Sequence, residues 1–182
     1  MSRIPTPADT AAAPEASRPL LDAVNKQLGS VPNLFRIVSN SPAALEGYLS
    51  LSGALAKGKL PAATRERIAL AVAEINECGY CLAAHSYLGK NLAKLDSTEI
   101  VANRNGSSTD ARAAVAVNFA TTIARRRGAV AGGEVQAVRD AGYSDAEIVE
   151  IIAHVALNTL TNYVNEVLGT EIDFPVVEAL AA

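Results

Sequence analysis

The sequence predicts an all-α protein of about eight helices with a single core. Of its 182 residues, 49% are hydrophobic, which is enough for a well-packed domain. Aromatic residues make up only 4%, and alanine and leucine supply most of the apolar side chains, which favours helices over strands. Few stretches alternate with β-branched residues as strands do.

The chain begins with a segment of different composition. Residues 1–17 are rich in Pro, Ala and Ser, and we expect a flexible or loosely docked arm here. A basic stretch followed by an apolar run is absent, so this arm is not expected to be a signal peptide. The helical domain is then expected to span residues 18–182.

Helix signals follow in order along the first part of this domain. A short helix over 18–29 is expected to end at Gly29. A loop with one helical turn should occupy 30–42. Ser41 then caps a helix that has Pro42 at its first position.

Two helices are expected in the middle of the chain, and the first of them should be central. The stretch 58–76 becomes apolar on nearly all sides after Arg67, which is typical of a buried helix. A second helix over 76–96 has Asn76 as its expected N-cap and ends at Gly89 or near Asp96.

Further helices are expected along the rest of the chain: over 97–106 with Ser97 or Asp96 as cap, over 109–128, over 132–142, and over 144–169 with a Ser144–Glu147 capping box. The tail 170–182 should be extended and docked.

The charge pattern excludes some classes of partner. The 16 basic and 19 acidic residues give a net charge of −3, which argues against nucleic-acid binding. The basic run at 125–127 is interpreted as a solvated helix end. No apolar stretch is long enough to cross a membrane, so we expect a cytoplasmic protein without a membrane partner. In a reducing compartment, paired cysteines indicate redox or metal chemistry.

Both cysteines of the chain lie close to one of its two histidines, in ECGYCLAAHSYLG (77–89). On a helix, Cys78, Cys81 and His85 stand at i, i+3 and i+7 and share one face. The first turn of a helix stabilises a thiolate, which is the nucleophile toward peroxides and disulfides. Expulsion of an alkoxide or hydroxide then requires a proton, which His85 could supply if a carboxylate orients it. Spacing alone leaves Glu66, Glu74 and Glu77 open as that carboxylate.

Glu66, Cys78, Cys81 and His85 together reproduce the pattern E-x11-C-x-x-C-x3-H. In this pattern the chain resembles alkylhydroperoxidase D, within the carboxymuconolactone decarboxylase superfamily. The segment VPNLFRIVSNSPAALEGYLSL is also similar to the one that precedes this core in such proteins. The likeness covers roughly 30–170 and is firmest over 43–90. One difference is Tyr80, where alkylhydroperoxidase D has a second histidine directly before its reactive cysteine.

The resemblance implies a fold, an activity and a set of site residues. Cys81 would be the peroxidatic thiol, Cys78 the resolving thiol, and Glu66 and His85 the proton relay. The implied activity is antioxidant reduction of an organic hydroperoxide or hydrogen peroxide, without metal or organic cofactor, by an alkylhydroperoxidase D-like helical bundle. The implied partners are a dithiol reductant protein of unknown identity and further copies of the chain, in a trimer or hexamer.

Other interpretations of these residues stay open at this point. The cysteines could be buried as small hydrophobic residues. A zinc site could use Cys78, Cys81 and His85, with Glu66 or water as the fourth ligand. His154, within apolar EIIAHVALN, is interpreted as a satisfied core histidine. The chain could also be a decarboxylase-type enzyme, which would not need the cysteine pair, or a redox sensor that does not turn over peroxide.

Overall fold

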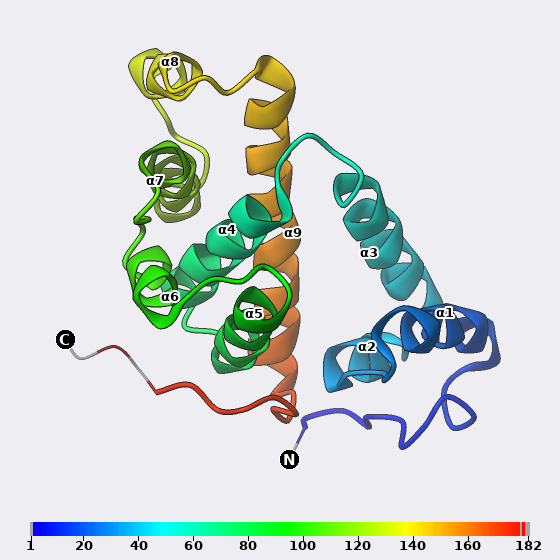
Figure 1. Ribbon diagram of the computed structural model, residues 1–182. Coiled ribbons are helices and arrows are strands. Elements are labelled where there is room, and N and C mark those ends of the chain that lie inside the picture. The colour runs from blue at the N-terminus through cyan, green and yellow to red at the C-terminus, as the bar shows by residue number, and fades with distance from the viewer. Residues whose placement is uncertain (1, 179, 181–182) are drawn as a thin grey trace.

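The computed structural model describes residues 2–178 and 180, and in that part of the chain it contains nine α-helices and no strand (Figure 1). The predicted all-α class is confirmed. A short 3-10 turn, η1 (Glu15–Ser17), precedes the helices. These are α1 (Arg18–Leu28), α2 (Asn33–Val38), α3 (Pro42–Leu55), α4 (Ala62–Ile75), α5 (Gly79–Asn91), α6 (Ser97–Arg104), α7 (Ala111–Arg126), α8 (Gly132–Asp140) and α9 (Asp145–Leu168).

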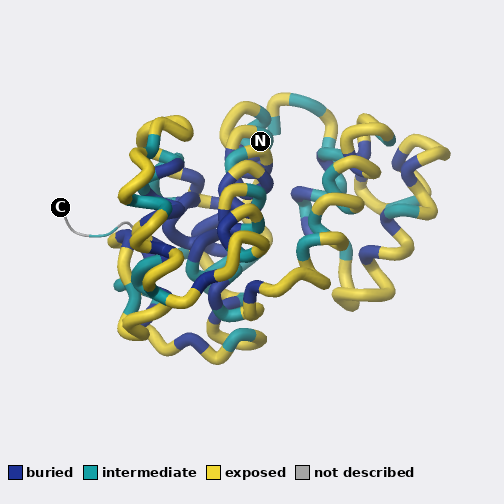
Figure 2. Tube along the Cα trace, turned by 90° about the horizontal axis from the view of Figure 1, so that it is seen from above, coloured by how far each residue is buried: buried dark blue, intermediate teal, exposed yellow. Residues whose placement is uncertain are grey.

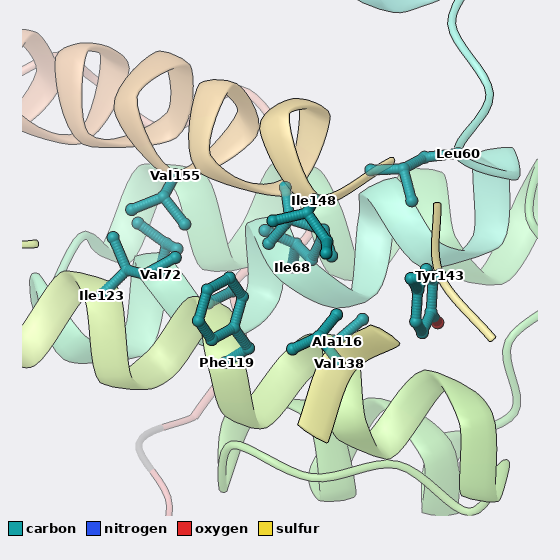
Figure 3. Close-up of a cluster of buried hydrophobic side chains, with 12 residues drawn as sticks. Leu60, Ile68, Val72, Ala116, Phe119, Ile123, Val138, Tyr143, Ile148 and Val155 are labelled. Carbon is teal, nitrogen blue, oxygen red and sulfur yellow. The ribbon is translucent and has the colours of Figure 1, made fainter. Parts of the chain in front are cut away.

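Helix α4 is the centre of the fold, as its apolar sequence predicts. Every residue from Ile68 to Ala73 is buried, and α4 packs against α5, α6, α7 and α9. The alternation of alanine with larger side chains lets the neighbouring helices approach closely. Ile68 and Val72 meet Phe119 of α7 and Val155 of α9 in the main hydrophobic cluster (Figure 3).

The helices form two groups on either side of α9. Helices α7 and α8 lie on one side, and α1, α2 and α3 lie on the other (Figure 1). The second group has a small core of its own around Leu21 and Leu45. Buried residues concentrate where helices face one another, and the outward faces are exposed (Figure 2). Within the described part of the chain, no helix is both long and apolar enough to span a membrane.

Most helix ends follow the expected capping chemistry. Ser41 accepts the Ala44 N–H, and Ser144 and Glu147 form the predicted capping box. Of the two candidate caps for α6, Asp96 is the one that accepts a backbone N–H. The basic run at 125–127 is exposed at the end of α7, as predicted. Helix α2 is the largest difference, because six residues are helical where a single turn was expected.

Both ends of the chain contact the helices. Arg36 donates hydrogen bonds to the carbonyls of Pro7 and Ala8, and the Arg3 N–H donates to the carbonyl of Leu168 at 2.7 Å. The division into an arm (1–17) and a domain (18–182) nevertheless stays a prediction. After α9 the chain is extended to residue 178. It docks as predicted, through a hydrogen bond to Asp173 and the ring contacts of Phe174. Residues 179, 181 and 182 of the expected tail lie outside the described residues.

Candidate active site

The turn between α4 and α5 places the two cysteines. Asn76 is the C-cap of α4, so the expectation that it caps the following helix is wrong. Its Nδ2 instead donates to Oδ1 of Asn162 at 2.8 Å, which ties the turn to α9. Glu77 adopts a left-handed conformation with φ of 53°, and this sharp reversal starts the new helix two residues later than expected.

Cys78 is the N-cap of α5. Its Sγ accepts the backbone N–H of Cys81 at 3.3 Å, which is the hydrogen bond that a serine oxygen usually accepts at this position. Cys81 therefore sits in the first turn of α5, where the helix dipole favours an anion. Both thiols are free, and both residues are buried. The start of α5 thus fixes the positions of both cysteines, and their burial shields them from bulk water.

The surroundings of the two sulfurs separate their acidities. A hydrogen bond from the Cys78 thiol lowers the pKa of Cys81, burial opposes it, and His85 and Asn165 lower it further, to about 6. The Nδ2 of Asn165 on α9 lies 3.2 Å from the Cys81 sulfur. The same thiol hydrogen bond, together with burial, raises the pKa of Cys78. Near neutral pH, Cys81 is therefore the thiolate and Cys78 is the thiol that donates to it.

Glu66 is the carboxylate that pairs with the histidine. Its Oε2 lies 2.9 Å from Nδ1 of His85, and both side chains are about one-fifth exposed, at 23% and 22%. Burial alone would lower the pKa of His85, but the Glu66 carboxylate outweighs it and the pKa is raised. His85 therefore holds a proton more readily than an isolated imidazole, and the Cys81 thiolate adds to that effect. Of the three open candidates, Glu74 instead pairs with Arg104 at 2.6 Å.

A cavity of about 650 Å³ connects these groups. It lies between the α1–α3 group and helices α4, α5 and α9, and Glu66, Cys81 and His85 all line it. Cys78 is not part of the lining. The walls are mostly apolar, formed among others by Val24, Leu28, Leu34, Phe35, Leu49 and Leu157. An organic molecule could therefore reach the thiolate from this side.

The surroundings of Cys81 also contain residues that the sequence analysis missed. Asn165, on α9, contacts the Cys81 sulfur, and it belongs to a row of amides at i, i+4 and i+7 with Asn158 and Asn162. Amides repeated on the buried face of an apolar helix are a signal that could have identified them. Tyr48 of α3 lines the cavity too. Burial, followed by the negative charges of Cys81 and Glu66, raises the pKa of Tyr48 to about 12, so its phenol remains protonated.

His154 does not match its expected environment. It is 6% exposed, but its Nε2 has no hydrogen-bond partner, so it is not a satisfied core histidine. It lines the same cavity as Cys81. Burial, followed by the charge of Arg65, lowers the pKa of His154 to about 4, so its ring is neutral near pH 7.

Two aromatic contacts hold the segment that covers the start of α5. The ring of Phe174 packs edge-on against Tyr80 and also contacts Tyr87. The Tyr80 hydroxyl accepts the backbone N–H of Leu34 at 3.1 Å, and Asp173 accepts that of Asn33 at 2.8 Å. Tyr80 thus joins α5 to α2 and to the C-terminal segment.

Among residues 2–178 and 180, no group of three or more His, Cys, Asp and Glu side chains is arranged as a metal site.

Comparisons with known proteins agree with this picture. The model of the carboxymuconolactone decarboxylase family matches residues 42–117, which include α3, α4 and α5. A solved structure from Ralstonia eutropha JMP134, an alkylhydroperoxidase AhpD core described as an uncharacterized peroxidase-related protein, is similar with a TM-score of 0.84. It is 26% identical, over 94% of this chain and 92% of that one. None of the curated proteins compared with the chain matches it.

Two other similar structures show the same fold at lower identity. An uncharacterized peroxidase-related protein from Silicibacter sp. TM1040 is 24% identical over 93% of this chain and 91% of that one, with a TM-score of 0.80. The debrominase Bmp8, in a complex of a variant with 2,3,4-tribromopyrrole, is 18% identical over 95% and 94% of the two chains, with a TM-score of 0.78.

Proposed function

The chain is an alkylhydroperoxidase D-like member of the carboxymuconolactone decarboxylase superfamily, and from this premise we propose that it reduces hydroperoxides with its Cys78–Cys81 pair. The observation that carries the proposal is the lowered pKa of Cys81 at the wall of a cavity that also contains the Glu66–His85 pair. A thiolate, an adjacent proton donor and a second thiol are the three groups that the reaction needs.

The first half of the reaction consumes the peroxide. The Cys81 thiolate attacks the terminal oxygen of ROOH, an S–O bond forms, and the O–O bond breaks. Sulfur is oxidised to sulfenic acid, and the electron pair of the broken bond leaves on RO⁻. Protonated His85 gives its proton to RO⁻ and releases the alcohol, while Glu66 holds the ring and stabilises its charged form.

The second half restores the thiols. The Cys78 sulfur attacks the Cys81 sulfur, an S–S bond forms, and the S–O bond breaks. The Cys78 proton and the departing hydroxide leave as water, with His85 available to carry the proton. A dithiol reductant protein then reduces the disulfide by thiol exchange and becomes oxidised itself. The net reaction converts ROOH and a dithiol into ROH, water and a disulfide.

Thiol titration with one equivalent of hydroperoxide tests the proposal. Reduced protein should lose two thiols and produce one alcohol per equivalent, and Cys81→Ser should lose none. With a dithiol supplied, a peroxidase continues to consume peroxide, whereas a decarboxylase-type enzyme or a redox sensor does not. Retention of both thiols after exposure would contradict the proposal.

Reductive removal of a halogen is a second candidate function. The debrominase Bmp8 shares the fold, and the apolar cavity next to a thiolate would accommodate an aromatic ring as well as an alkyl chain. Release of bromide from a bromopyrrole, measured beside peroxide consumption, separates the two candidates. Bromide release without peroxide turnover would move the function to dehalogenation.

We also propose that the chain assembles with copies of itself, as a trimer or hexamer. Exposed apolar residues follow the outer face of α9 at heptad-like spacing: Val149, Ile152, Leu160, Tyr163 and Val167. A stripe with this period suits packing against another helix. Sedimentation should show an oligomer that Leu160→Glu with Tyr163→Glu disperses. A wild-type monomer at micromolar concentration would contradict this part of the proposal.

A further inference from the structure

The end of the cavity away from the cysteines contains two polar groups that the proposed chemistry does not use. These groups are the imidazole of His154 on α9 and the guanidinium of Arg65 on α4, and both line the cavity. The cavity wall as a whole is mostly apolar, although Asn158 and Thr161 of α9 also line it. Polar groups at the far end of an apolar cavity are the usual means of fixing the orientation of a ligand.

His154 has no hydrogen-bonding partner for its ring. Among the described residues, neither ring nitrogen accepts or donates a hydrogen bond, and the Nε2 atom is fully buried. Only 6% of the residue is exposed. A buried polar atom without a partner costs free energy, so its presence in a cavity wall points to a ligand that supplies the missing partner. The neutral ring has one N–H to donate.

Arg65 is held in place but keeps part of its guanidinium free. Its Nη1 donates to the carbonyls of Ala56 at 3.1 Å and Leu60 at 3.0 Å, which fixes the group at the end of α3. No carboxylate of the described residues forms an ion pair with it. The nearby acids already have partners, because Glu150 accepts the N–H groups of Lys59 and Leu60 and Glu66 pairs with His85.

The separation along α9 between His154 and the level of the Cys81 thiolate follows from the helix geometry. Leu60, just before α4, contacts Glu150, and Asn76, just after α4, contacts Asn162, so α4 and α9 run in the same sense. His154 is therefore level with the start of α4, and Asn165 is level with Cys81. The eleven residues from His154 to Asn165 correspond to about 16 Å along the axis of α9.

We propose that the cavity binds an elongated organic hydroperoxide that carries a carboxylate at its other end, with the peroxide at Cys81 and the carboxylate at Arg65 and His154. This inference rests on the proposed function and names its substrate class. Arg65 supplies the positive charge and His154 supplies an N–H, while the apolar walls accept the hydrocarbon between the two ends. Charge-assisted hydrogen bonds of this kind are stronger than neutral ones.

A series of ω-hydroperoxy carboxylic acids of increasing length, each compared with its methyl ester, tests the proposal. For the wild-type protein, kcat/KM for the acid should exceed that for the ester by about ten-fold or more at the best chain length, which is the fold-change of one charge-assisted hydrogen bond. The ratio should approach one in Arg65→Met and in His154→Leu. Arg125→Met removes an exposed charge on α7 and should keep the wild-type ratio.

Binding of the matching ω-hydroxy carboxylic acids, measured by calorimetry, is an independent readout. These product analogues cannot react, so their binding does not depend on peroxidase activity. Binding that is lost in Arg65→Met, in a protein that consumes no hydroperoxide, would reject the proposed function and support the carboxylate site. Equal wild-type kcat/KM for acid and ester, or an unchanged ratio in a folded Arg65→Met protein, would overturn the inference. Arg65→Lys, which keeps the charge, serves as the second variant if Arg65→Met does not fold.

Discussion

The sulfur of Cys78 accepts the backbone N–H of Cys81 at 3.3 Å, so one cysteine caps the helix whose first turn carries the other. This relationship makes the two thiols unequal. The thiol that caps the helix donates its proton toward its neighbour, and the neighbour receives the benefit of the helix start, of His85 and of Asn165. The two cysteines of the C-x-x-C pattern thereby differ in acidity, with Cys81 the more acidic thiol.

Alkylation should therefore distinguish the two thiols. The pKa of Cys81 is lowered to about 6, so the first thiol of reduced protein should react with iodoacetamide at a rate that is half-maximal near that pH. Below this pH the sulfur is protonated and unreactive. Stopped-flow alkylation across pH measures the midpoint, and Cys81→Ser should react slowly throughout. A first midpoint at the ordinary thiol value of about 8.5 would contradict the assignment.

Substitution of Asn165 should raise the pKa of the Cys81 thiol in a graded manner. Asn165→Leu removes the Nδ2 donor that lies 3.2 Å from the sulfur, and Asn165→Asp also adds a negative charge there. The pKa of Cys81 should rise from wild type to the Leu variant and again to the Asp variant. The same alkylation profile checks the order. Identical midpoints in all three proteins would show that the amide does not stabilise the thiolate.

The Glu66–His85 pair should control the rate and not the fold. Glu66→Gln keeps the size of the side chain but removes the charge that raises the pKa of His85, so peroxide reduction should slow by roughly ten-fold to a thousand-fold. Glu74→Gln is the matched control, because Glu74 pairs with the buried Arg104 and should affect the melting temperature more than the rate. An unchanged rate in Glu66→Gln with a loss in Glu74→Gln would reverse the assignment.

The sequence predicted the helices well because their signals are local. Caps such as Ser41 and Ser144 act over three or four residues, and the apolar run of α4 marks a buried helix wherever it lies. The start of α5 was misplaced because a thiol is an unusual cap and the left-handed Glu77 is invisible in a propensity argument. Asn76 is a residue type that often caps the start of a helix, but here its side chain donates a hydrogen bond to Asn162 on α9.

The site was predictable only in part for the same reason. Cys78, Cys81 and His85 lie on one helix, so their spacing was informative, and the family pattern singled out Glu66 among three carboxylates. Asn165 contacts the Cys81 sulfur and His154 lines the cavity, both from α9, and only the packing of α9 against α4 and α5 brings these distant residues to the site. Their contribution depends on tertiary structure, which one sequence does not specify residue by residue.

His154 should reduce the stability of the protein. Replacing it with Leu removes a buried nitrogen that has no hydrogen-bond partner, which should raise the free energy of unfolding by about 1–3 kcal/mol. At this chain length, each kcal/mol should raise Tm by about 2–4 °C. The pKa of His154 is lowered from 6.5 to about 4, so the unfolded chain binds its proton first as the pH falls. The advantage of His154→Leu should thus grow between pH 6.5 and about 4. Thermal melts in this window check it, and a lower Tm for the variant would contradict it.

Trapping of a sulfenic acid tests the central assignment most directly. Cys78→Ser, reduced and then exposed to one equivalent of cumene hydroperoxide with dimedone, should carry one adduct, and peptide mapping by mass spectrometry should place it on Cys81. The lowered pKa of Cys81 and its position in the cavity wall are the reasons for this expectation. An adduct that forms only on Cys78 in the converse Cys81→Ser variant, with none on Cys81, would contradict the account.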